Sequence, residues 1–257
     1  MTKRRKLVLE ASILTIGFLA TQLVDISFRY WVILALGVIS YFFSALILKE
    51  DLKKTGWFLV LLPIVYYVVA FSLFYFLLPT NILIRVLILV LFGIGAYAVL
   101  LTENIFSVVS GFQTIQLLRA AQAVGFLITL ITAFFGYNTV FSYKSFTWWN
   151  GLFVFLISWP LIISSLWSIS LEVVISAKLI SHSFILSLIM GEIAFFISFW
   201  PLTITTSSLF LISFLYVVLG IGQSHFAGRL FKNTLYEYLQ VGVIIFIITL
   251  FLTHWRG

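Results

Sequence analysis

Cysteine is absent from the 257 residues of this chain, and charged side chains are scarce. The first absence excludes disulfide bonds, cysteine-ligated zinc, iron–sulfur clusters and a thiol nucleophile. Charged residues make up 9% of the sequence, against about a quarter in ordinary globular domains. A soluble fold of this size needs far more polar surface to cover its core. The composition therefore excludes a soluble globular domain and indicates a membrane protein.

Sequence motifs of common catalytic sites are also missing. The chain has no His-Glu-x-x-His or Gly-x-Gly-Asp motif of a membrane protease, no phosphate-binding Walker loop and no Gly-x-Ser-x-Gly elbow. We therefore expect no cofactor, no bound metal and no named catalytic residue, and an enzyme is the less favoured class.

Long apolar runs dominate what is present. Apolar residues make up 63% of the chain, and the mean hydropathy is +1.20. A helix needs about 20 apolar residues to cross a bilayer, and helices are the open-chain structure that satisfies its backbone groups in lipid. We predict an all-α, polytopic transmembrane helix bundle forming a single domain over 1–257, with eight spans as the alternative to nine. The nine expected spans are 7–23, 30–48, 57–78, 82–101, 117–136, 151–178, 183–200, 202–221 and 238–254.

Basic residues fall in short loops between the apolar runs, although the net charge of +7 is also typical of nucleic-acid binding. Since cytoplasmic loops are enriched in Lys and Arg, we predict a cytoplasmic N-terminus, an external C-terminus, a location in the cell (cytoplasmic) membrane and no nucleic-acid partner. Nine spans place eleven of the fifteen basic residues inside: Lys3, Arg4, Arg5, Lys6, Lys49, Lys53, Lys54, Arg119, Lys178, Arg229 and Lys232.

Two segments have patterns beyond simple apolar runs. Residues 102–116 alternate apolar and polar residues at helical spacing, which predicts an amphipathic helix along the cytoplasmic interface; an extension of the fifth span is the alternative. Residues 159–182 and 200–225 both begin with Trp-Pro-Leu and end with Ser-His. This similarity predicts duplicated helical hairpins starting at 159 and 200, with chance similarity as the alternative. Pro63, Pro160 and Pro201 are expected to kink or end helices.

Carboxyl groups inside apolar spans are costly and need a partner or a purpose. Glu10 is one helical turn from Lys6, so we expect an ion pair. Glu172 and Glu192 are each ten residues from a turn expected near His182, which places them at similar depth on facing helices. Three serines share the helix face of Glu172: Ser165, Ser168 and Ser176. If the two side chains face each other, they form a carboxylate pair suited to proton or cation coupling. The favoured interpretation is that each carboxylate has a purely structural partner, either a Ser, Thr or Trp donor in the bundle or, for Glu172, Lys178.

Further polar groups lie at the expected cytoplasmic ends of helices. They are Arg119, Gln122, Lys178, His182 and His225. The two histidines are compatible with a metal ligand pair, but no Cys or loop carboxylate accompanies them, so ordinary interfacial residues are favoured.

Three functions remain open. The first is a non-enzymatic membrane scaffold or subunit that packs against lipid, membrane-protein partners or further copies of itself. The second is a small proton- or cation-coupled transporter that uses Glu172 and Glu192. The third is an intramembrane enzyme that modifies lipids, for which the sequence offers few polar side chains.

Overall fold

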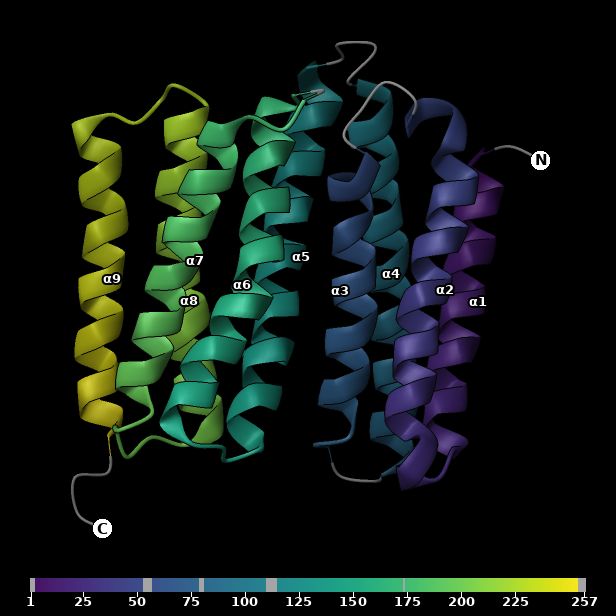
Figure 1. The fold of residues 1–257 in the computed structure, drawn as a ribbon, viewed down its shortest axis with the longest axis horizontal. Helices are drawn as coiled ribbons and strands as arrows, with labels where there is room; N and C mark the ends of the chain where they lie inside the picture. Colours follow the sequence, from purple (N-terminus) through teal and green to yellow (C-terminus); the bar gives the residue numbers. More distant parts are fainter. Residues whose placement is uncertain (1–2, 53–56, 79–80, 110–114, 173, 254–257) are drawn as a thin grey trace. The chain divides into compact units, whose positions relative to one another are not determined.

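The computed structural model describes residues 3–52, 57–78, 81–109, 115–172 and 174–253 (Figure 1). In these residues the chain forms nine α-helices, each long and apolar enough to cross a bilayer, and no strand. The predicted all-α fold and the nine spans are confirmed, and the chain is a multi-pass membrane protein. The helices are α1 (Lys3–Leu23), α2 (Ile26–Leu52), α3 (Trp57–Tyr75), α4 (Ile82–Val109), α5 (Ile115–Ser142), α6 (Thr147–Ser170), α7 (Ala177–Ile197), α8 (Ile204–Phe226) and α9 (Lys232–Leu252).

Large apolar side chains cover much of the outer surface of these helices. Trp31 on α2 is 70% exposed, Ile94 on α4 is 63% exposed and Phe251 on α9 is 85% exposed. In water, exposed apolar area on this scale promotes association, whereas lipid tails cover it without cost. The surface therefore fits a bilayer as the surrounding solvent.

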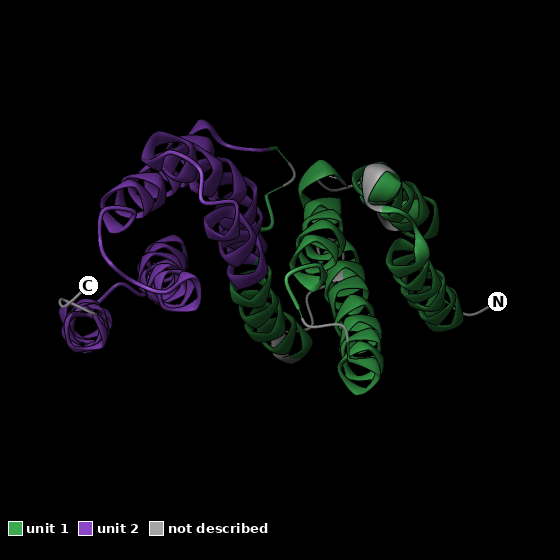
Figure 2. Cartoon of the chain, turned by 90° about the horizontal axis from the view of Figure 1, so that it is seen from below, with its two compact units in different colours: residues 1–132, 171–174 green, residues 133–170, 175–257 purple. Residues whose placement is uncertain are grey.

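The chain divides into two compact units (Figure 2), where the sequence predicted one domain. Unit 1 comprises residues 1–132 and 171–174, and unit 2 comprises residues 133–170 and 175–257. In unit 1, α1 and α3 each pack against both α2 and α4. In unit 2, α6 packs along α7, and α8 contacts α6, α7 and α9.

Aromatic rings fill the centre of unit 1. Phe18 of α1 stacks on Phe92 of α4 with ring centroids 4.4 Å apart, and Phe71 and Tyr75 of α3 meet Phe18 edge-on. Tyr67 of α3 donates a hydrogen bond to the carbonyl of Phe92 at 3.3 Å. The cluster joins three helices, and edge-on ring contacts add to the energy gained from burial.

In unit 2, the helices α6 and α7 approach through glycine. A methyl group on Gly191 would lie 2.9 Å from the carbonyl oxygen of Gly151, so the two backbones are in direct contact. Ser183, Ser187 and Gly191 follow one another every four residues along the buried face of α7. Small residues at this spacing allow membrane helices to pack closely.

The end of α4 differs from the expected interfacial helix over 102–116. Residues 102–109 continue α4 through Val109, and residues 110–114 lie outside the described residues. The physical reason is that Glu103, Phe106 and Ser107 are buried, so this stretch packs inside unit 1 instead of lying along the membrane surface.

The two segments interpreted as a repeat have different secondary structure where they begin. Trp159 and Pro160 lie inside α6, whereas Trp200 and Pro201 precede α8, whose N-cap is Thr203. The duplication therefore stays a prediction, and its two Trp-Pro-Leu starts are not structurally equivalent.

Candidate carboxyl site

The predicted polar stripe is not continuous in the structure. Leu171 has a φ of 48°, and this left-handed conformation ends α6 at Ser170. Glu172 therefore lies beyond α6, and Ser176 is the N-cap of α7, where its hydroxyl accepts a hydrogen bond from the Leu179 N–H at 3.3 Å. The prediction that four polar residues share one helix face was wrong. Run length of apolar residues alone extends the predicted helix past its actual end at Ser170.

Ser165 and Ser168, the two members of the stripe that remain on α6, are buried. The Ser168 hydroxyl donates to the carbonyl of Ser165 at 2.7 Å. The amide of Gln223 on α8 donates to the Ser165 hydroxyl at 2.9 Å. Ser165 therefore links α6 to α8 within unit 2.

Glu192 lies on α7, which begins at Ala177 and not after His182. The turn used to place Glu172 and Glu192 at one depth is therefore absent, because His182 is itself within the helix. Glu192 is exposed, and Glu172 belongs to the other unit. The coupling of these two carboxyl groups stays a prediction.

The structure brings together three of the predicted polar groups at helix ends. The rings of His182 on α7 and His225 on α8 stack with centroids 5.7 Å apart. His182 Nδ1 lies 2.8 Å from the Lys178 carbonyl oxygen, and the Lys178 ammonium lies 5.6 Å from the ring centroid of Phe226. Within the described chain, no three His, Cys, Asp or Glu residues are grouped to hold a metal ion.

Arg119 and Gln122 lie apart from these groups in the sequence, on the part of α5 that belongs to unit 1. Arg119 is exposed and Gln122 is half-buried. The neighbouring Ala121 is fully buried.

Two carboxyl groups that the sequence analysis did not select are buried in unit 1. Glu10 on α1 is 1% exposed and lies on the same buried face of the helix as Leu7, Leu14 and Phe18. Its Oε1 accepts a hydrogen bond of 2.6 Å from the Ser44 hydroxyl of α2. The predicted ion pair with Lys6 is wrong, because Glu10 faces the helix bundle and Lys6 is exposed.

Glu103 on α4 is the second of these groups and is also 1% exposed. Its Oε1 accepts a hydrogen bond of 3.0 Å from the backbone N–H of Ile64 on α3. Pro63 explains why a main-chain donor is present there. Proline has no N–H and its ring crowds the carbonyl four residues earlier, which weakens helical hydrogen bonding around it, although α3 continues through Pro63. The N–H that follows then bonds a side chain of another helix.

The two carboxyl groups lie on helices that pack against each other, Glu10 on α1 and Glu103 on α4. Glu10 is seven residues after the start of α1, and Glu103 is six residues before the end of α4, so both lie about 10 Å from the same end of unit 1 at about 1.5 Å per residue. Each Oε2 atom is buried and has no hydrogen-bond partner among the residues that the structure describes. Among the described residues, no basic side chain bonds either group.

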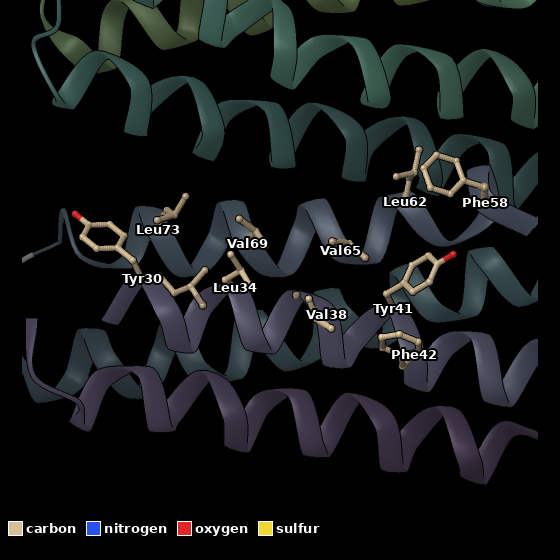
Figure 3. Close-up of a pocket in the computed structure, with 12 residues that line it drawn as sticks. Tyr30, Leu34, Val38, Tyr41, Phe42, Phe58, Leu62, Val65, Val69 and Leu73 are labelled. Atoms are coloured by element: carbon tan, nitrogen blue, oxygen red, sulfur yellow. The ribbon is translucent and has the colours of Figure 1, made fainter. Parts of the chain in front are cut away.

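An apolar groove also lies in unit 1, between α2 and α3 (Figure 3). It has a volume of about 590 Å³ and runs from Tyr30 and Leu73 at one end to Tyr41 and Phe58 at the other, past Gly37. Neither Glu10 nor Glu103 lines it. The groove is therefore separate from the carboxyl pair and offers it no polar access.

Four helices of unit 1 thus each contribute one group to the Glu10–Glu103 site. The helix α1 supplies Glu10, α2 supplies Ser44, α3 supplies the Ile64 N–H and α4 supplies Glu103. Comparison of the chain with models of protein families, with curated proteins and with solved structures found no match.

Proposed function

We propose that this chain moves protons across a membrane, alone or coupled to another solute, and that Glu10 and Glu103 hold the proton. The observation that carries the proposal is the burial of two carboxyl groups on packed apolar helices, with no basic partner among the described residues. Ionisable groups at such depth are expensive and mark ion pathways and proton relays. The membrane we propose is the cytoplasmic membrane, with the N-terminus inside.

The hydrogen bonds of the pair favour a proton over a metal ion. Each Oε1 atom already accepts a donor, and each Oε2 atom lacks one. A protonated carboxyl group has one O–H to donate, so a single proton satisfies one free oxygen and removes one of two like charges. A metal such as Ca²⁺ takes six or more oxygen ligands, and two free oxygens fall well short.

Pro63 gives the site an element that is able to change shape. The Ile64 N–H donates to Glu103, so the strength of that bond depends on the charge of Glu103. Proton binding at Glu103 is in this way linked to the hydrogen bonding of α3 next to Pro63.

The test is proton flux into phosphatidylcholine vesicles that contain the protein and a pH-sensitive dye, driven by a potassium diffusion potential. We expect Glu10→Gln and Glu103→Gln to lower the flux by about 10² or more, as for other groups that transfer protons directly. Glu237→Gln changes an exposed carboxylate of α9 and should leave the flux unchanged. Equal flux in all four proteins, or none above empty vesicles, would contradict the proposal.

Infrared difference spectra across pH examine the pair directly. If the two groups share a proton, Glu10→Gln must move the pH at which the Glu103 carboxyl band titrates. An unmoved Glu103 band would mean two independent groups. A scaffold or subunit without transport is the alternative function, and it predicts that neither substitution changes proton permeability.

A further inference from the structure

Between Phe184 and Phe196, the outward face of α7 has one charge among apolar side chains. We call this surface the α7 face. It consists of Phe184, Ile185, Leu188, Ile189, Glu192 and Phe196, all exposed. The opposite side of the helix, with Ser183, Ser187 and Gly191, is buried and packs against α6. The α7 face is therefore the side of the helix that is left for an outside partner.

Glu192 has no hydrogen bond or ion pair with the described residues of the chain. It is five residues before the end of α7, which places it about 8 Å inside the span at about 1.5 Å per residue. Lys and Arg reach the interface from such depth on three or four methylene groups, whereas glutamate has two. Lipid alone therefore leaves this carboxylate poorly solvated.

We propose that the α7 face binds a transmembrane helix of another protein that carries a lysine or arginine opposite Glu192. The charge decides the occupant: a basic side chain neutralises Glu192, and apolar side chains above and below it pack against the remaining residues of the face. A second copy fits less well, because a two-fold contact through this face sets Glu192 against Glu192. The proposal involves neither Glu10 nor Glu103 and is independent of proton movement.

The test uses designed single-span helices as the probe. One leucine–alanine peptide of about 21 residues carries a lysine five residues from the end that lies beside the end of α7, and its control has leucine at that position. Because the chain lacks cysteine, a dye is attached at one introduced position, Phe199→Cys, just beyond α7. Energy transfer to a dye on the peptide then reports binding in phosphatidylcholine vesicles.

We expect the lysine peptide to bind about threefold to tenfold more tightly than the leucine peptide. This ratio corresponds to the energy of a typical polar contact between membrane helices. Glu192→Gln should abolish that preference, and Glu237→Gln should retain it. The comparison of the two peptides is made on protein with Glu192 intact, so it does not depend on folding of a charge variant.

Two outcomes overturn the proposal. In the first, both peptides bind the protein with Glu192 intact equally well, which means that the carboxylate does not recognise a cation. In the second, labelled copies of the protein associate with each other through a contact that Glu192→Gln abolishes, which means that the α7 face is a contact between copies of this chain.

Discussion

Gly191→Ala is expected to separate α6 from α7 and to destabilise unit 2. The added methyl group would lie 2.9 Å from the Gly151 carbonyl oxygen and 2.9 Å from Cβ of Phe155. Neither atom belongs to the free end of a flexible side chain, so the two helices have to move apart. Extra atoms in a well-packed interface cost about 1–3 kcal/mol.

Alanine also favours the helical state over glycine by about 1 kcal/mol, so Gly191→Ala needs a control with the same gain. Gly242→Ala on α9 provides it, because its new methyl group would meet Val217 at 3.8 Å, an ordinary contact. The difference between the two variants isolates the steric cost, and we expect Gly191→Ala to be less stable by about 1–3 kcal/mol.

The assay is reversible unfolding in mixed detergent micelles, followed by circular dichroism, for both variants and the unmodified protein. Gly151→Ala places its methyl group 3.0 Å from the Gly191 carbonyl oxygen and should behave like Gly191→Ala. If Gly191→Ala and Gly242→Ala unfold at the same detergent composition, the backbones of α6 and α7 are not in contact and the packing described above is incorrect.

Two further predictions concern unit 1, with the same unfolding assay. Gly95→Ala puts a methyl group onto the hydroxyl of Tyr67, so it should destabilise the protein, and Tyr67→Phe should recover about 1 kcal/mol in the double variant; independent, additive effects would contradict the contact. Ser44→Ala removes the donor to buried Glu10 and should cost about 1–3 kcal/mol, whereas Ser44→Thr keeps a hydroxyl and should cost less; equal stability of the two variants would show that this bond contributes little.

The positions of the nine spans could be predicted because run length and hydropathy follow directly from bilayer thickness. The helix ends could not. The left-handed conformation of Leu171 ends α6 inside a stretch, residues 161–178, that contains no glycine or proline. Likewise α4 continues to Val109, because buried contacts of Glu103 and Phe106 outweigh the polar appearance of 102–109.

The carboxyl pair was missed for a different reason. Local spacing connected Glu10 with Lys6, although the buried series of Leu7, Leu14 and Phe18 places Glu10 on the inner face of α1. That periodicity was available in the sequence and outweighs one nearby lysine. The partner Glu103 was not available, because residues 93 positions apart meet only once α1 and α4 are packed together.

The donor to Glu103 has a consequence for mutational studies of this protein. The N–H of Ile64 belongs to the main chain, so every replacement of Ile64 except proline keeps the donor. A scan of side chains would therefore report residue 64 as an ordinary apolar position and would find the effect one residue earlier, at Pro63. At this site Ile64 supplies the hydrogen-bond donor, and the preceding Pro63 makes that donor available to Glu103.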